Sequence, residues 1–315
     1  MTPVRWGFLG AGFVASRGVA PVVHDSTVAV LQCVAARDLS RAEALEPARA
    51  VTEYESVCEA DDVDAVYVSL PNDAHLPWVV RALEAGKHVL CEKPLALDAD
   101  QVRAMRDAAD AAGVVLVEAA WNRWHPRTRR VADLLSDVAA PSVSRSWFTF
   151  PGVPDGNYRL DPSRGGGALL DVGCYAIGAA LLALGPDVAV EAAQASTGPT
   201  GVDLTISSAL RSPVGTAEIR GSFQEPESQG WHVEAPGLVL DVPHPAFTSW
   251  REPSSLVVTR DGAELTETFG SCDAYRLMVD AVSDRVAGGD AWVLPVSESL
   301  AVARAVDLVR EAAAR

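Results

Sequence analysis

The sequence predicts an α/β protein: a first domain built on a parallel sheet, followed by an α+β domain whose sheet is mostly antiparallel and open on one face. Three observations predict this. In the first 120 residues, short apolar runs alternate with helical patterns of ~10–15 residues, which indicates strands joined by crossover helices. The first apolar run ends directly in a glycine-rich turn. From residue 188 onward, runs with period-two alternation follow one another without a helix between them, which indicates antiparallel pairing.

Length and composition limit the function. A chain of 315 residues suggests about two domains, which we place at residues 1–120 and 121–315. The formal net charge of -16 would repel phosphate backbones and anionic lipid, so neither nucleic acid nor a membrane surface is an expected partner. Five cysteines form no Cys-x-x-Cys pair, which favours free thiols in the cytoplasm and no metal site. The sequence has no run of 18 or more apolar residues, and we expect no transmembrane helix.

The glycine-rich turn begins where the first predicted strand, Val4 to Leu9, ends, and it has the pattern Gly10-x-Gly12-x-x-Ala15. In a Rossmann dinucleotide fold, the first glycine permits the tight turn and the second lets backbone N–H groups approach the pyrophosphate. The small third residue lets the next helix pack closely against the strand. The helix N-terminus then faces the anion with its positive end. We therefore predict a dinucleotide site, against the alternative of a turn that binds nothing.

The second predicted strand, Ala29 to Ala36, ends in Arg37-Asp38, at about the spacing at which this fold meets the adenosine ribose. Asp38 would accept hydrogen bonds from ribose hydroxyls and favour NAD, whereas Arg37 would pair with a 2′-phosphate and favour NADP. Asp38 also precedes a capping-box pattern, Ser40-x-x-Glu43, so it has a structural alternative. We predict NADP, with NAD as the alternative.

Two further strands predict loops at the same edge of the sheet. The run from Ala65 leads into Leu70-Pro71-Asn72-Asp73-Ala74-His75, and Val89-Leu90-Cys91 leads into Glu92-Lys93-Pro94. Proline cannot continue a strand ladder, so the chain turns there and leaves the Lys93 ammonium at the carboxyl edge of the sheet. In open α/β sheets this edge binds ligands. The alternative for Lys93 is a solvated loop lysine, and for His75 a capping or packing role.

The alternation of strands and helices stops after a strand that ends at Glu118. Aromatic and cationic side chains concentrate in the linker from Ala119 to Pro126, which includes Trp121 and Arg123. Such a cluster is suited to lining a cleft between domains, and the alternative is a packing seam.

A later helix, predicted from Ala168 to Leu184, begins directly after three consecutive glycines and carries Asp171 and Tyr175. These residues are four positions apart and share a face of the helix. A carboxylate and a phenol on an otherwise apolar helix are costly to bury without partners, which favours a site. A hydrogen-bonded pair within the core is the alternative.

The other helices are predicted over residues 76–85, 98–112, 126–135, 274–286 and 296–314, with a strand at about 144–150. From residue 188 onward the alternating runs predict a meander, including 203–207, 216–220 and 237–241. We expect helices on one face of this sheet only. The other face would be left to solvent or to a second subunit, giving a homodimer or homotetramer.

Several of these motifs occur in the same order in a known family. The motifs are Gly10-x-Gly12-x-x-Ala15, Pro71-Asn72-x-x-His75, Ala85-Gly86-Lys87-His88 through Glu92-Lys93-Pro94, and Gly165-Gly166-Gly167 through Asp171-Val172-Gly173-Cys174-Tyr175. In them the chain resembles the Gfo/Idh/MocA oxidoreductases over most of its length. Within that family it looks closest to the dimeric dihydrodiol dehydrogenases, glucose-fructose oxidoreductases and NADP-linked xylose dehydrogenases. Tyr175, where many inositol dehydrogenase relatives have histidine, argues against a cyclitol substrate.

The resemblance implies an NAD(P)-dependent oxidoreductase that moves a hydride between a nicotinamide and a carbinol or carbonyl carbon of a sugar or small cyclic alcohol. Lys93 and Tyr175 would share the proton, and Asp171 would orient Lys93 or a substrate hydroxyl. Arg123 and Tyr158 are candidates for substrate contacts. The predicted cofactor contacts are Gly10, Gly12, Phe13, Val14, Arg37, Asp38, Leu70, Pro71, Asn72, His75, Glu92, Lys93, Pro94 and Trp121.

Two other functions stay open on the sequence. A ketosugar reductase of deoxysugar synthesis would use the same residues on a nucleotide-linked substrate. A non-catalytic sensor would keep the dinucleotide fold only to bind a ligand. The presence of Lys93, Asp171 and Tyr175 together argues against the sensor, because binding alone does not require a buried amine and phenol.

Overall fold

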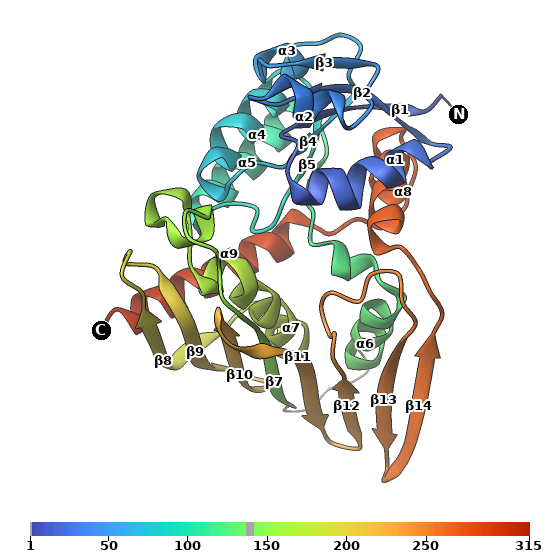
Figure 1. Ribbon diagram of the computed structural model, residues 1–315. Coiled ribbons are helices and arrows are strands. Elements are labelled where there is room, and N and C mark those ends of the chain that lie inside the picture. Colours follow the sequence, from blue (N-terminus) through green and yellow to red (C-terminus); the bar gives the residue numbers. More distant parts are fainter. Residues whose placement is uncertain (1, 137–141) are drawn as a thin grey trace. The chain divides into compact units, whose positions relative to one another are not determined.

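The computed structural model describes residues 2–136 and 142–315 (Figure 1). The chain divides into two compact units. The first comprises the residues up to Ala96, Asp100–Trp121 and Asp273–Ser299, and the second comprises Leu97–Ala99, Asn122–Cys272 and Leu300–Arg315. The segment Asp273–Ser299, which the sequence placed in the second domain, thus lies in the first unit.

The first unit contains a six-stranded parallel sheet in the order β3-β2-β1-β4-β5-β6. The predicted parallel sheet is confirmed. Because β1 lies between β2 and β4, the strand order reverses there, and this reversal is where open α/β sheets bind ligands. The strands are β1 Val4–Leu9, β2 Ala29–Ala35, β3 Arg49–Val51, β4 Ala65–Val68, β5 His88–Cys91 and β6 Leu116–Glu118.

The helices of this unit follow the predicted order. Gly86 and Gly113 have φ of 75° and 66°, the left-handed conformation that ends the predicted helices before them. Two short elements, β3 and α3, were not predicted, because three or four residues are too few to show a period. The helices are α1 Ala20–His24 after a π-helical turn Ala15–Val19, α2 Leu39–Glu43, α3 Glu55–Cys58, α4 His75–Glu84, α5 Ala99–Ala112 and α8 Ala274–Val286.

Helix α8 joins the first unit through specific contacts. The indole N–H of Trp6 in β1 donates to the Ser283 hydroxyl at 3.1 Å, and both side chains are buried. The ring of Tyr275 lies 3.1–3.2 Å from the position that a Cβ on Gly18 would take. A larger residue at Gly18 would therefore push the helix away.

The second unit contains an eight-stranded mixed sheet in the order β14-β13-β12-β11-β7-β10-β9-β8. The predicted meander is wrong in one respect. Strand β7 inserts between β10 and β11 and pairs with β10 in parallel. The sequence did not show this because β7 lies far upstream of the other strands. The strands are β7 Ser142–Pro151, β8 Ala189–Thr197, β9 Asp203–Ser212, β10 Gly215–Ser222, β11 Gln224–Ala235, β12 Leu238–Val242, β13 Ser254–Arg260 and β14 Ala263–Phe269.

Helices cover one face of this sheet (Figure 1). They are α6 Pro126–Ser136, the π-helical turn Leu169–Gly173 that continues as α7 Cys174–Leu184, and the part of α9 (Val296–Ala313) from Leu300 onward. Ile177 of α7 and Val306 of α9 share a core with Ile206 and Leu210 of β9.

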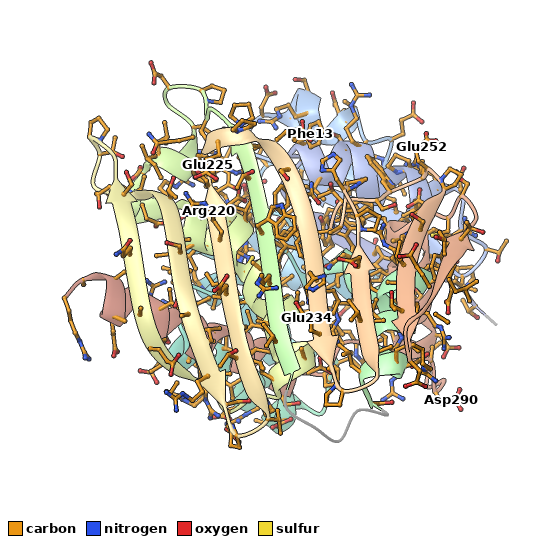
Figure 2. All side chains as sticks on the ribbon, turned by 90° about the horizontal axis from the view of Figure 1, so that it is seen from below. Phe13, Arg220, Glu225, Glu234, Glu252 and Asp290 are labelled. Atoms are coloured by element: carbon orange, nitrogen blue, oxygen red, sulfur yellow. The ribbon has the colours of Figure 1, made fainter. Side chains whose placement is uncertain are left out.

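The opposite face carries charged side chains, among them Arg220, Glu225 and Glu234 (Figure 2). Strand β10 shows the alternation clearly, since Glu218 and Arg220 are exposed while Ala217 and Ile219 are buried. The predicted sheet with one open face is confirmed.

One helical segment, Pro162–Leu184, meets the length and composition expected of a membrane-spanning helix, which the sequence analysis did not anticipate. In the protein, 83% of its most apolar window is buried. The core helix of a soluble protein meets the same test, so the segment is weak evidence for a membrane.

Candidate functional site

The two glycines of the turn have different roles, because the fold requires Gly10 but not Gly12. Gly10 has φ of 98°, and a Cβ there would lie 2.3 Å from the Ser69 carbonyl oxygen, so Gly10 lets the ends of β1 and β4 meet. At Gly12 the nearest atom to such a Cβ is the Ser69 hydroxyl oxygen, 4.0 Å away. Among residues 2–136 and 142–315, no packing contact requires glycine at this position. The space is what a pyrophosphate would need to approach the backbone, so the turn fits a dinucleotide.

The first helical turn after the glycines has the features of an anion site. Its first N–H groups, at Phe13 and Val14, have no acceptor within a helix that is just beginning. Ala15 is fully buried, as the motif requires, while Phe13 is 76% exposed. An exposed phenylalanine at this position is available to a ligand.

Asp38 and Arg37 lie exposed directly after β2. The Asp38 carboxylate accepts from the backbone N–H and the hydroxyl of Ser40, at 3.0 and 2.7 Å, and so caps helix α2. The capping box predicted with Ser40 as its cap is wrong, because Asp38 is the cap. The hydrogen bond from the Ser40 hydroxyl lowers the pKa of Asp38. This carboxylate is therefore engaged, while Arg37 stays exposed.

Arg41 was missed in the sequence. Its guanidinium donates to the carbonyl of Ala11 in the glycine turn, at 2.8 Å. This contact holds a second arginine between the turn and the predicted ribose site. Its position four residues after Arg37, on the helix that Asp38 caps, was the only signal.

His75 connects two of the predicted ligand loops. The imidazole is fully buried, with one ring nitrogen 3.0 Å from the carbonyl of Pro94 and the other 2.9 Å from that of Leu70. Burial lowers the pKa of His75. The ring therefore supports the loops after β4 and β5, as its packing alternative foresaw, and its predicted cofactor contact stays a prediction.

Lys93 lies in the loop directly after β5, and two buried carboxylates, those of Glu92 and Glu118, hold the residues next to it. Glu92 is buried, and its carboxylate accepts from the Tyr67 hydroxyl at 2.5 Å. The buried carboxylate of Glu118 accepts from the backbone N–H of Leu95 at 3.0 Å. Burial raises the pKa of Glu92 to about 7. Lys93 is half-buried, and hydrogen bonds at Glu92 and Leu95 hold its loop in place.

Trp121 lies in the first unit, in the 3₁₀ turn Trp121–Trp124 that also holds Arg123. Its ring stacks on Tyr275 of α8, with centroids 4.6 Å apart and planes at 25°. The indole is 6% exposed, so most of its surface contacts protein. A cofactor contact through its remaining surface stays a prediction.

In the second unit, glycines 165–167 let the loop around Arg159 pack closely against the start of the helical segment that begins at Leu169. A Cβ at Gly166 would lie 2.5 Å from the carbonyl oxygen of Arg159. Gly167 has φ of 116°, and its N–H donates to that same carbonyl at 2.9 Å. The glycines therefore let the loop that holds Tyr158 and Arg159 close onto the turn that holds Asp171.

Asp171 lies in the π-helical turn and is 8% exposed. Its carboxylate accepts from Nε of Arg159 at 2.7 Å. The Arg159 guanidinium also lies over the ring of Tyr158, 4.8 Å from its centroid. Arg159 was missed in the sequence, where only the motif Asn157-Tyr158-Arg159 pointed to it. π-Helical turns occur often at functional sites, and here one follows each glycine motif.

Tyr175 is the second residue of α7, and its ring packs between two phenylalanines. Its ring centroid lies 5.6 Å from that of Phe148 and 5.9 Å from that of Phe247. Gly173 and Gly221 allow this helix to approach the sheet, because a Cβ on Gly221 would lie 3.1 Å from the Gly173 nitrogen. The phenol is thus held on a rigid element.

The structure gathers the predicted residues within each unit. In the first, the loops after β1, β2, β4 and β5 share the carboxyl edge of one parallel sheet, as predicted. In the second, Tyr158 and Asp171 both contact Arg159. The convergence of Lys93 and Tyr175 on one reacting carbon stays a prediction. In the part of the chain that is described, no cluster of three His, Cys, Asp or Glu could hold a metal ion.

Comparison with known proteins places the chain in a family. Residues 4–120 match the oxidoreductase family with an NAD-binding Rossmann fold named GFO_IDH_MocA, and residues 138–237 match the GFO/IDH/MocA C-terminal domain. The chain is 38% identical to D-xylose 1-dehydrogenase (NADP(+)) 2 of Haloferax volcanii, over 98% of this chain and 97% of that protein. The chain belongs to the Gfo/Idh/MocA oxidoreductases.

Two further Gfo/Idh/MocA relatives extend the comparison. Trans-1,2-dihydrobenzene-1,2-diol dehydrogenase of Mus musculus is 28% identical over 98% of this chain and 96% of its own length. The crystal structure of a 3-ketoreductase from Actinomadura kijaniata, in complex with NADP and TDP-benzene, has a TM-score of 0.90. It is 30% identical, with 99% of this chain and 98% of that chain covered.

Membership in the Gfo/Idh/MocA family confirms several predictions made from sequence. The family, the two-part fold and the class of enzyme, an NAD(P)-dependent oxidoreductase that acts on CH–OH groups, are all as expected. The resemblance to xylose and dihydrodiol dehydrogenases is confirmed as well.

Proposed function

We propose that this Gfo/Idh/MocA oxidoreductase is an NADP-linked sugar dehydrogenase. It transfers a hydride reversibly between C4 of the nicotinamide and a carbinol carbon of an aldose or related cyclic alcohol. One observation carries the proposal: among the described residues no packing contact explains the glycine at position 12, and Arg41 of α2 reaches the same turn through the carbonyl of Ala11. The first unit would bind the cofactor and the second would supply the substrate contacts.

NADP is preferred over NAD for a structural reason. Asp38 is engaged as the cap of α2, which leaves Arg37 and Arg41 as the charged groups for the adenosine end. A guanidinium matches the geometry of a phosphate and pairs with it strongly. The NADP in the name of the xylose dehydrogenase and in the 3-ketoreductase complex supports this choice.

The protein's own part in the reaction is to hold and move one proton. When bound, the nicotinamide supplies or accepts the hydride. Lys93 and Tyr175 are the proposed proton carriers, since the loop of Lys93 is held through Leu95 and the ring of Tyr175 packs against Phe148. Both are poor acids near pH 7 at their ordinary pKa values of ~10, but an ammonium within ~4–6 Å stabilises a phenolate.

Of the two roles predicted for Asp171, orienting Lys93 or orienting a substrate hydroxyl, only the second is proposed. Nε of Arg159 donates to the Asp171 carboxylate at 2.7 Å, so this carboxylate is already paired with a cation. It is proposed to orient a substrate hydroxyl, with Tyr158 and Arg123 as further substrate contacts.

A ketosugar reductase is the second candidate function. It is favoured by the likeness to the Actinomadura kijaniata 3-ketoreductase, whose structure holds a TDP compound. A nucleotide-linked substrate would need basic side chains to meet its diphosphate. Arg159 of the candidate substrate site is already paired with Asp171, so we rank this function second.

We also propose that the protein acts in the cytoplasm as a homodimer or homotetramer. The open face of the second sheet, with its paired charges, would form the contact between subunits. The five cysteines are free thiols, which suits a reducing compartment.

The experiment that tests the function has two stages. Fluorescence titration with NADPH and NADH first measures which cofactor binds. An absorbance screen at 340 nm then follows turnover of D-xylose, other aldoses, 1,5-anhydroketoses, dihydrodiols and a dTDP-linked ketosugar. Turnover of aldoses with NADP supports the proposal, and turnover of the dTDP sugar alone would replace it with the ketosugar reductase. Tighter binding of NADH would contradict the role given to Arg37.

A further inference from the structure

We propose that Arg159 is a substrate-binding residue, whose terminal guanidinium nitrogens donate to two adjacent oxygens of a neutral sugar. This inference rests on the proposed function and adds a residue and a substrate class to it. It combines three observations: how the side chain is held, which of its donors are used, and how its charge is balanced.

The guanidinium is oriented from two sides. Its Nε donates to Asp171 at 2.7 Å, and its Cζ lies over the Tyr158 ring, 4.8 Å from the centroid. With 30% of the side chain exposed, the group is partly withdrawn from water and still accessible. An arginine held in this way has already lost the conformational freedom that binding would otherwise cost.

The backbone of Arg159 is equally constrained. Its N–H donates to the Asn157 side chain at 3.0 Å, and its carbonyl accepts from Gly167 at 2.9 Å. Gly166 must lack a side chain for this contact, because a Cβ would lie 2.5 Å from the same carbonyl. Three residues of the loop therefore determine where the guanidinium lies.

Its strongest donors remain available. Across residues 2–136 and 142–315, the side chain of Arg159 makes no other hydrogen bond than the one from Nε to Asp171. The two terminal nitrogens together carry four N–H groups in a fixed plane. Because the side chain is 30% exposed, these donors can reach a ligand that supplies acceptors.

The balance of charge decides the substrate class. Asp171 neutralises Arg159, so the pair has no net charge with which to attract a diphosphate. Neutral hydroxyl and ring oxygens accept hydrogen bonds from such a pair, and two on neighbouring carbons match the spacing of the terminal nitrogens. The geometry therefore favours an unmodified aldose over a nucleotide-linked sugar.

Two variants separate binding from structural support. Arg159→Lys keeps the ion pair with Asp171 but loses the planar fork, and Arg159→Met loses both. Arg130→Met is the matched control, because it breaks another arginine–carboxylate pair of the same unit, that with Glu267 at 2.8 Å. Each protein is saturated with NADPH, and the affinity for D-xylose, or for whichever aldose the wild type oxidises, is measured by calorimetry without turnover.

We expect the aldose Kd to rise ~10-fold in Arg159→Lys and ~100-fold in Arg159→Met, with the NADPH Kd unchanged and Arg130→Met like the wild type. A deoxy aldose that lacks one contacted hydroxyl sharpens the test. The wild type should bind it ~10-fold more weakly than the parent sugar, and Arg159→Met should no longer distinguish the two.

Two results would overturn the inference. One is wild-type aldose affinity in Arg159→Lys, which would mean that Arg159 serves only to hold Asp171. The other is a deoxy-sugar discrimination that survives in Arg159→Met. Failure of the proposed function looks different, since the wild type itself would then bind no NADPH or oxidise no sugar.

Discussion

Lys93 shows how the chemistry of one residue depends on the backbone around it. Its neighbours are held by Tyr67 through Glu92 and by Glu118 through Leu95. An amine in such a loop can be presented to a substrate in one orientation, which a solvated lysine cannot. The pattern Glu-Lys-Pro identified the residue, and the contacts of its neighbours explain why its position is reproducible.

We expect Lys93→Met to bind NADPH as the wild type does and to lower turnover by ~10²–10⁴-fold, because a positioned proton donor or acceptor contributes that much. Stopped-flow measurement of the 340 nm change at saturating substrate checks this. Lys87→Met, whose ammonium donates to the carbonyls of Ala60 and Val63, serves as the lysine control. Unchanged turnover in Lys93→Met would remove Lys93 from the proton transfer.

Gly10 and Gly12 offer a matched pair of substitutions. Gly10→Ala should destabilise the protein by ~1–3 kcal/mol or more, because its φ of 98° and the 2.3 Å approach to the Ser69 carbonyl leave no room for a Cβ. Gly12→Ala meets only open space and should unfold like the wild type, yet bind NADPH at least ~10-fold more weakly. Urea unfolding and fluorescence titration check both. Full NADPH affinity in Gly12→Ala would place the pyrophosphate elsewhere.

Arg37 decides between the two cofactors. Arg37→Ala should raise the Kd of NADPH by ~10-fold or more and leave that of NADH nearly unchanged, since only NADPH has the 2′-phosphate. Arg49→Ala, which loses an ion pair with Asp62 on the same sheet, controls for a general loss of charge. Equal weakening of both cofactors would contradict the assignment.

Among the elements, the helix that begins at the π-helical turn is the most informative. Asp203 of β9 accepts from the backbone N–H of Leu169 at 2.6 Å and so caps this helix from a distant strand. Burial raises the pKa of Asp203 to about 6. A carboxyl whose folded pKa lies above its ordinary value favours the folded state most when it is protonated.

The sign of the pH effect follows. Between about pH 4 and 6 the folded protein holds the Asp203 proton more tightly than the unfolded chain, so this group's contribution to stability falls as pH rises, by about 3 kcal/mol at most. Asp203→Asn keeps an acceptor for Leu169 and removes the titration. Its free energy of unfolding should exceed that of the wild type at pH 7.5 and match it near pH 4.

Urea midpoints at the two pH values check this prediction. The difference between variant and wild type is the quantity to compare, because other groups titrate in the same range. His125 is one of these other groups. Burial lowers its pKa to about 4, so its contribution to the free energy of unfolding is lost in both proteins as pH falls below 6.5. A difference that does not change with pH would show that Asp203 is ionised throughout.

At the scale of the whole molecule, the open sheet face predicts association. Arg145 pairs with Glu234 at 3.0 Å on this face, and a shallow hollow of about 470 Å³ lies beside it. We expect Arg145→Glu, which places three acids together with Glu218 and Glu234, to convert the assembly to monomers. Sedimentation velocity checks this, with Arg106→Glu on α5 as the control for charge. A wild type that sediments as a monomer would contradict the proposed assembly.

Much of the molecule was predictable from sequence, and the reason is that the relevant signals are local. The alternation of strands and helices, the ends of α4 and α5 at glycines, and the four ligand loops on one edge all follow from short patterns. Short elements such as β3 and α3 escaped because they contain too few residues to show a period.

By itself, the sequence determined the fold class and the family, because periodicity, glycine spacing and motif order are properties of neighbouring residues. The tertiary structure alone decided that β7 lies between β10 and β11, that Gly10 serves the fold while Gly12 does not, and that Arg159 holds Asp171. Each of these depends on atoms that only the folded chain brings within a few ångströms, and no pattern along the chain records such distances.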